Sequence, residues 1–128
     1  MTWYQDFYAG VDAMDITVVE RLCTPDTTVR FANHPPAEGR EQVRAALEHV
    51  WSTIGGLRHN IKEVTEAGDR CVIEAVVDYT RLDGSVVSIP AATAIELRDG
   101  LIATQRIYID MAPLDEPSKR QPEREVLK

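Results

Sequence analysis

Residues 70–110, RCVIEAVVDYTRLDGSVVSIPAATAIELRDGLIATQRIYID, decide the fold of this chain. The branched and apolar residues that favour strands dominate three runs within this stretch, at residues 71–80, 86–97 and 101–111. Asp-Gly pairs lie between the runs, and this dipeptide between alternating hydrophobic segments is typical of a hairpin turn. The stretch therefore predicts an antiparallel meander of three strands.

The segments before the meander alternate between helical and extended patterns. Apolar residues recur every three or four positions in residues 3–22 and 40–53, which predicts helices. We expect the first helix to break near Met14. Residues 27–33 and 57–65 favour strands. Helices gathered early and strands gathered late predict an α+β domain, with the helices on one face of a curved sheet and a cone-shaped cavity between the two layers.

The overall charge and length limit the classes of partner. A chain of 128 residues is long enough for one domain with its own core. Its net charge of −7 argues against nucleic acid or an anionic membrane surface, and no apolar run is long enough to cross a bilayer. A small molecule or another protein is the expected partner. The two cysteines, without CxxC spacing, indicate reduced thiols and a cytoplasmic location.

The end of the chain differs in composition from the rest. From Pro113 onward, prolines and charged residues replace the periodic apolar pattern. Such a composition favours mobility over a packed structure. The sequence therefore predicts one domain over residues 1–112 and a mobile tail over residues 113–128.

Three segments carry a resemblance to a known family. They are the N-terminal helical stretch, the sequence FANHPPAEGRE at residues 31–41, and DGLI at residues 99–102 followed by RIYID at residues 106–110. With them, residues 3–112 resemble the NTF2-like superfamily, in particular its SnoaL-like and limonene-epoxide-hydrolase-like branch. The resemblance implies a cone-shaped fold with N-terminal helices on the concave face of an antiparallel sheet, and it suggests a homodimer. The same cone houses isomerases, cyclases, hydrolases and binding domains.

Epoxide hydrolases of this branch use an Asp-Arg-Asp set with a Tyr and an Asn that hold the attacking water. The resemblance places Asn33 and Asp78 at two of these positions. The remaining Arg, Asp and Tyr positions are occupied by Val76, Ile107 and Phe31. Opening an epoxide needs one group to activate water and another to protonate the oxygen, so the resemblance does not imply that activity here.

Ketosteroid isomerases share the cone but place a general-base Asp, a Tyr and a second Asp inside it. An approximate alignment puts Phe31, Phe7 and Thr93 at those positions. None of these three side chains performs the required proton transfers. The resemblance therefore implies the more general SnoaL-like plan, a hydrophobic pocket with one or two polar groups inside.

Asp78 is the leading catalytic candidate in the meander. It shares a strand face with Val72 and Val76, and we expect that face to line the cavity. Loss of solvation would raise the pKa of this carboxyl group and make it an acid or base near neutral pH. In the alternative interpretation, Asp78 is solvated near the strand end and pairs with Arg81 or Arg58.

Asn33 and His59 complete the predicted catalytic set. Asn33 would orient a water or a substrate carbonyl, or else tie the chain into a turn. His59 would relay protons with Asp78, or else be structural. The histidines lack the close spacing of metal ligands, so we do not expect a metal. The sequence shows no phosphate loop or dinucleotide fingerprint, and we expect no cofactor. Substrate-binding side chains are expected at Phe31, Trp51, Val76, Ile89, Ala91, Thr93, Gln105, Ile107 and Ile109.

The other face of the first meander strand predicts an interface between two copies. It carries Cys71, Ile73, Ala75, Val77 and Tyr79, which is too apolar a set to leave in water. We therefore expect a homodimer through the sheet.

Together these features favour a cofactor-independent isomerase, cyclase or hydrolase of the SnoaL-like kind. Its substrate would be a small apolar molecule such as a polyketide, terpenoid or steroid-like compound. One alternative is a non-catalytic dimeric ligand-binding protein. A protein–protein adaptor is a further alternative, and it rests on fold analogy alone.

Overall fold

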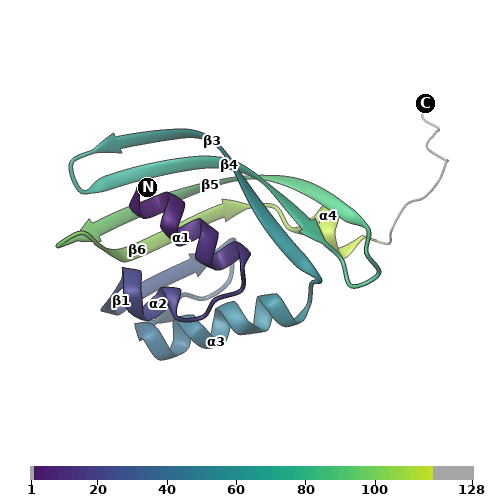
Figure 1. Cartoon of the computed structure of the whole chain (residues 1–128), viewed down its shortest axis with the longest axis horizontal. Coiled ribbons are helices and arrows are strands. Elements are labelled where there is room, and N and C mark those ends of the chain that lie inside the picture. Colours follow the sequence, from purple (N-terminus) through teal and green to yellow (C-terminus); the bar gives the residue numbers. More distant parts are fainter. Residues whose placement is uncertain (1, 117–128) are drawn as a thin grey trace.

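The computed structural model of the chain describes residues 2–116, which form two layers (Figure 1). The helices are α1 (Trp3–Asp12), α2 (Val18–Leu22), α3 (Gly39–Ser52) and α4 (Ala112–Asp115). The strands are β1 (Cys23–Phe31), β2 (Ala37–Glu38), β3 (Gly56–Ala67), β4 (Arg70–Thr80), β5 (Val86–Arg98) and β6 (Leu101–Ile109). The predicted order of two helices, a strand, a helix and four long strands is confirmed, with the short β2 and α4 as additions.

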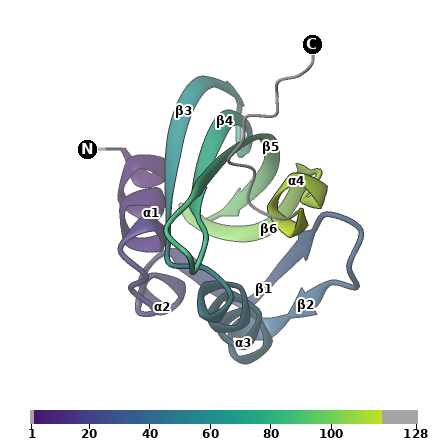
Figure 2. The same cartoon turned by 90° about the vertical axis from the view of Figure 1, so that its right-hand side faces the viewer.

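The strands form one curved sheet in the order β2-β1-β6-β5-β4-β3. All neighbouring strands are antiparallel except β1 and β6, which run parallel. The sequence had predicted an antiparallel sheet, so this one pair differs from the prediction. Figure 2 shows α1, α2 and α3 gathered on one side of this curve. The predicted α+β architecture, with helices covering one face of a curved sheet, is therefore confirmed.

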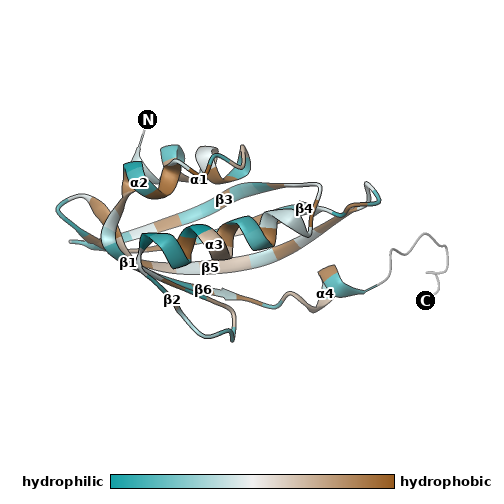
Figure 3. Ribbon diagram, turned by 90° about the horizontal axis from the view of Figure 1, so that it is seen from below, coloured by the Kyte–Doolittle hydropathy of each residue, from teal (hydrophilic) through white to brown (hydrophobic). Residues whose placement is uncertain are grey.

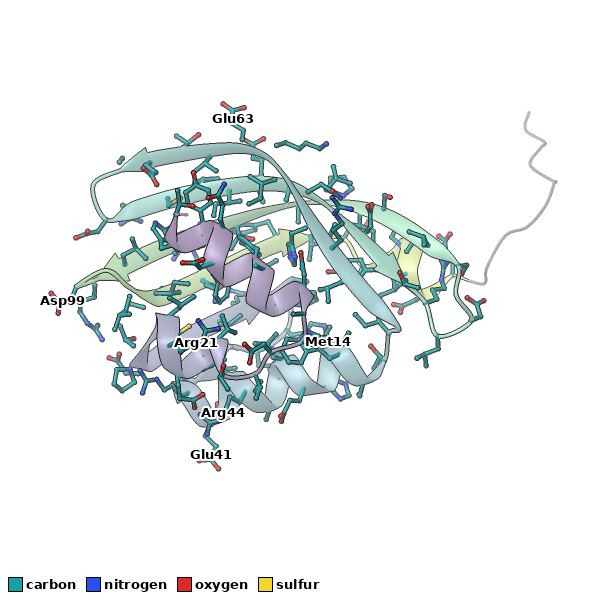
Figure 4. The ribbon with its side chains drawn as sticks, in the orientation of Figure 1. Met14, Arg21, Glu41, Arg44, Glu63 and Asp99 are labelled. Atoms are coloured by element: carbon teal, nitrogen blue, oxygen red, sulfur yellow. The ribbon has the colours of Figure 1, made fainter. Side chains whose placement is uncertain are left out.

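The two meander turns differ in length, and together they set the register. Asp99 and Gly100 both have positive φ, 54° and 79°, as a two-residue hairpin turn of this kind requires. Figure 4 shows Asp99 at the outer end of the β5–β6 hairpin. The β4–β5 turn is longer, and the amide of Arg81 donates to the carbonyl of Ser85 across 2.7 Å. Thr80 consequently stands opposite Val86.

This register decides which sheet face meets the helices. Along β4, alternate residues are buried, with Ile73 and Val77 each only 1% exposed. The buried set is the one predicted to form a dimer interface, Cys71, Ile73, Ala75, Val77 and Tyr79. That assignment is wrong because the helices cover the more apolar face of the strand, where burial removes more hydrocarbon from water.

A left-handed residue separates the first two helices. Met14, labelled in Figure 4, has a φ of 56°, which ends α1 as the sequence predicted. The Asp15 carboxylate then accepts bonds from the Thr17 amide at 3.1 Å and the Thr17 hydroxyl at 2.7 Å. A Cβ at Gly10 would lie 2.9 Å from Val18, so α1 and α2 approach too closely for a larger side chain there.

Helix α3 closes the opposite side of the helical layer. Figure 3 shows hydrophobic and hydrophilic residues alternating along it, and Val43 and Trp51 are its buried side chains. Arg44, labelled in Figure 4, pairs with Glu20 of α2. One face of α3 therefore packs inward over β1 while its charged face ties it to α2.

The chain continues beyond the predicted domain limit. Leu114 of α4 packs against a second core cluster that includes Ile54 and Ile89. The Arg81 guanidinium donates to the carbonyl oxygens of Pro113 at 2.8 Å and Leu114 at 3.3 Å. The first residues of the predicted tail thus lie on the domain, and residues 117–128 are outside the described part of the chain. Within residues 2–116, no helix has the length and apolar character needed to cross a membrane.

Candidate functional site

A cavity of about 120 Å³ lies between the helices and the inner face of the sheet. Its wall is almost entirely apolar, with Val and Ile side chains from the strands opposite aromatic and aliphatic residues of α1 and α3. For comparison, an apolar cavity of about 150 Å³ holds a benzene molecule. The volume is therefore suited to a single ring or a group of similar size.

Most of the side chains predicted to bind substrate line this cavity. They are Phe31, Trp51, Ala91, Thr93, Gln105, Ile107 and Ile109. Ile89 points to the same side of the sheet but packs with Val77 and Tyr79 in the second core cluster. Val76 belongs to the opposite face, because it alternates with the inward-facing Ala75 and Val77.

Asp78 lies on the outer face of the sheet, away from the cavity. Its carboxylate accepts bonds from the Ser88 hydroxyl at 2.6 Å and the Asn60 amide at 3.0 Å. These two bonds, Ser88 first, hold the pKa of Asp78 below its usual range, the reverse of the shift expected from burial. The sequence analysis assigned the wrong face of β4 to the cavity, which misplaced both Val76 and Asp78. The alternative interpretation, in which Asp78 is solvated, describes its surroundings.

Asn33 also lies outside the cavity. It shares a surface depression with His34, with Tyr108 of β6 and with Asp110, which follows that strand. Its side-chain oxygen is 3.4 Å from the Arg30 guanidinium. Asn33 therefore belongs to the turn after β1, as its turn propensity favoured, and it does not meet His59 or Asp78 at a common site.

His59 is the predicted catalytic residue that reaches the cavity wall. Its partner is Asp12, at the end of α1, and not Asp78. The Nδ1 atom of His59 lies 2.6 Å from one Asp12 oxygen, and the His59 amide donates to the other oxygen at 2.9 Å. A carboxylate accepts hydrogen bonds, so this contact assigns a proton to Nδ1 of His59. In the neutral imidazole with that tautomer, Nε2 is an acceptor.

Two tyrosines add hydroxyl groups to the wall. The Tyr8 ring packs against the His59 ring with 4.5 Å between centroids. Burial raises the pKa of Tyr8 to about 12, partly offset by a hydrogen bond with Thr93. Burial also raises the pKa of Tyr79 to about 12. Both phenols therefore keep their protons at neutral pH and remain hydrogen-bond donors.

The sequence interpretation missed Tyr8 and Asp12, although a signal for them exists. They are four residues apart on a helix, which places both on one face. Asp12 is the last residue of α1 and follows the buried Val11, and its side chain is only 23% exposed. A tyrosine and a carboxylate on the inward stripe of α1 are the pattern that would have identified them.

The other reactive side chains stay buried or scattered. Both Cys23 and Cys71 are free and buried, as expected for reduced thiols, and burial raises the pKa of Cys23 to about 11. Such a thiol is protonated at neutral pH and is a poor nucleophile. Among the residues that the structure describes, no three His, Cys, Asp or Glu side chains gather as a metal site would require.

Several solved structures share this fold. A putative SnoaL-like polyketide cyclase from Jannaschia sp. CCS1 is 21% identical, with a TM-score of 0.79 over 94% of this chain and 91% of that one. TerC, crystallised with polyporic acid, is 22% identical, with a TM-score of 0.80 over 88% and 92% of the two chains. An LEH-like epoxide hydrolase from M. tuberculosis is 16% identical, with a TM-score of 0.73 over 85% and 80%.

At these identities the likeness establishes the fold and not the reaction. None of the curated proteins compared with the chain matches it in sequence. The family model of the SnoaL-like domain does match, over residues 4–105, which is most of the chain. The chain therefore belongs to the SnoaL-like domain family of NTF2-like proteins.

Proposed function

We propose that this protein is an enzyme that transfers protons on a small, mostly apolar cyclic molecule, in an isomerase-, cyclase- or hydrolase-type reaction. The observation that carries this proposal is that His59, in the wall of the apolar cavity, pairs with Asp12. The SnoaL-like family membership and the cyclase and hydrolase among the structural neighbours support it. A polyketide- or terpenoid-derived ring is the substrate class that we propose.

In this proposal His59 is the general base and Asp12 positions it. The two bonds to Asp12, one from the ring and one from the backbone of the same residue, fix the ring orientation. When Nε2 takes a proton from a substrate carbon, the carboxylate stabilises the imidazolium that forms. The side chain of His59 is only 16% exposed, so little water competes for Nε2 or screens this pair.

The substrate would acquire negative charge as the proton leaves. If the lost proton comes from the carbon next to a carbonyl group, that charge develops on the carbonyl oxygen. The protonated hydroxyl groups of Tyr8 and Tyr79 are donors in the same wall. An oxygen-bearing ring therefore fits the chemistry of the cavity better than a pure hydrocarbon.

Deuterium exchange in cyclohexanone tests the proposal without knowledge of the natural substrate. This single ring suits the cavity volume, and its α-protons exchange with D₂O only when a base removes them. We expect the protein to accelerate exchange above the buffer rate, measured by NMR of the ketone. Saturation with increasing ketone concentration would show that the reaction occurs in a binding site.

The alternative is a ligand-binding protein without catalysis, in which the Asp12–His59 pair only anchors a polar group. It predicts that cyclohexanone binds but exchanges at the buffer rate. Binding is measured from chemical-shift changes of cavity residues in the same NMR samples. Exchange at the buffer rate with clear binding would favour this alternative.

We also propose that two copies pair through the outer face of the sheet. On this face Val72 and Tyr108 are 40% and 60% exposed, and Ala92 and Ala94 lie between them on β5. A second copy would cover these apolar residues, with Glu74 and Arg106 beside them available for ion pairs across the interface. We expect light scattering to give twice the 14.3 kDa chain mass, and Tyr108→Glu to halve it. A wild-type monomer at micromolar concentration would contradict the dimer.

A cytoplasmic location remains part of the proposal. The two free, buried thiols support it, because oxidising compartments favour disulfides in small domains.

A further inference from the structure

Gln105 is a buried polar side chain without a hydrogen-bond partner for its carboxamide among residues 2–116. It lies on the inner face of β6, between Val29 of β1 and Ile95 of β5, and is 5% exposed. Its carboxamide lines the cavity and forms no hydrogen bond with any residue in the described range 2–116. A carboxamide offers two donors and an acceptor, so this side chain has its full hydrogen-bonding capacity available.

The neighbours of Gln105 do not supply a partner. Thr93, two residues from Ile95 on the same sheet face, is engaged with the hydroxyl of Tyr8. The remaining nearby wall consists of Val29, Ile107 and other hydrocarbon side chains. Placing an unpaired carboxamide among them is costly compared with an apolar residue of the same size.

A second lining residue shows the same feature. The indole N–H of Trp51, on the helical side of the cavity, is buried and has no acceptor among the described residues. Buried indole groups normally find a partner. Unpaired polar groups on both the sheet side and the helix side of one apolar cavity indicate that its occupant brings hydrogen-bonding atoms of its own.

We propose that Gln105 selects oxygen-bearing ligands, binding a hydroxyl or carbonyl group of a single-ring molecule in the cavity. The carboxamide accepts a hydrogen bond from a hydroxyl group or donates one to a carbonyl oxygen. A hydrocarbon ring offers neither a donor nor an acceptor. The inference deepens the proposed function, since it rests on the cavity holding a small cyclic molecule. It does not depend on proton transfer by His59.

Phenol and toluene test this selection because they have nearly the same shape and differ in a hydroxyl against a methyl group. Dissociation constants for both are measured by NMR titration of the full-length protein and of Gln105→Met, which replaces the carboxamide by an apolar chain of similar length. We expect the ratio of phenol to toluene affinity to fall about tenfold in the variant. Gln105→Leu, a second apolar replacement, should shift the ratio in the same direction.

Thr104→Val provides the matched control. Thr104 precedes Gln105 on β6 but points to the outer face, so removing its hydroxyl should leave the ratio unchanged. An unchanged ratio in both Gln105 variants would overturn the proposal, as would a wild-type protein that binds neither compound. Failure of cyclohexanone exchange together with a Gln105-dependent phenol preference would refute catalysis by His59 while supporting this inference.

Discussion

Replacing His59 by glutamine is expected to lower the protein-catalysed rate of cyclohexanone exchange by a factor of about 10² or more. Glutamine still donates a hydrogen bond toward Asp12 but has no nitrogen that accepts a proton at neutral pH. Ketone binding should change little, because the apolar wall remains. Exchange rates at saturating ketone and NMR titrations separate the two effects.

Asp78→Asn is the matched control for this experiment. It removes a carboxylate that the sequence placed in the cavity and the structure places on the outer face, bonded to Ser88 and Asn60. The exchange rate should stay at the wild-type value, with thermal unfolding confirming that both variants are folded. A loss of exchange in Asp78→Asn, with His59→Gln unaffected, would show that the assignment of the base is wrong.

Asp12→Asn is expected to reduce exchange by a similar factor of about 10² or more, through the tautomer of His59. Asp12 now accepts from two donors of one residue, the backbone amide and Nδ1–H. Asparagine has one acceptor oxygen, so its NH₂ group would face the other position. Both bonds are kept only if Nδ1 becomes the acceptor and the proton moves to Nε2.

Nitrogen NMR of the imidazole ring measures this change directly. We expect the neutral ring to carry its proton on Nδ1 in the wild type and on Nε2 in Asp12→Asn. Asp15→Asn serves as a control. Asp15 follows Met14, outside α1, and its carboxylate bonds to Thr17 and not to His59. An Nε2-protonated wild-type ring would contradict the proposed role of Asp12.

The elements of the fold were predictable because each has a local cause. The period of apolar residues gives α1 and α3, and the Asp-Gly pairs mark both ends of β5. The α1–α2 break at Met14 was predicted as well. β2 was missed because two residues carry no detectable alternation, and the parallel pairing of β1 with β6 depends on contacts distant in sequence.

The choice of catalytic residue failed for a reason of geometry. A strand presents two faces, and a chemically conspicuous residue such as Asp78 does not reveal which face meets the helices. The lining of β5 and β6 was predicted in the right parity, at Ala91, Thr93 and Gln105. Ala91 stands opposite Ala75 of β4, so Ala75 shares the inner face with Ala91. Val76 and Asp78 alternate with Ala75 and therefore lie on the outer face.

A local pattern could have placed Asp12 on the inward stripe of α1, but it could not have shown that Asp12 pairs with His59. The two residues are 47 positions apart, and they meet because α1 ends beside β3. Only the packing of the helix on the sheet converts a helix-end carboxylate and a strand histidine into a base with a fixed orientation.

A crystal structure with cyclohexanone bound would test the central claim most directly. The account predicts the ring inside the cavity, with an α-carbon about 3–3.5 Å from Nε2 of His59 and Nδ1 still bonded to Asp12. A ketone bound elsewhere, or bound in the cavity with Nε2 turned away from it, would contradict proton transfer by His59.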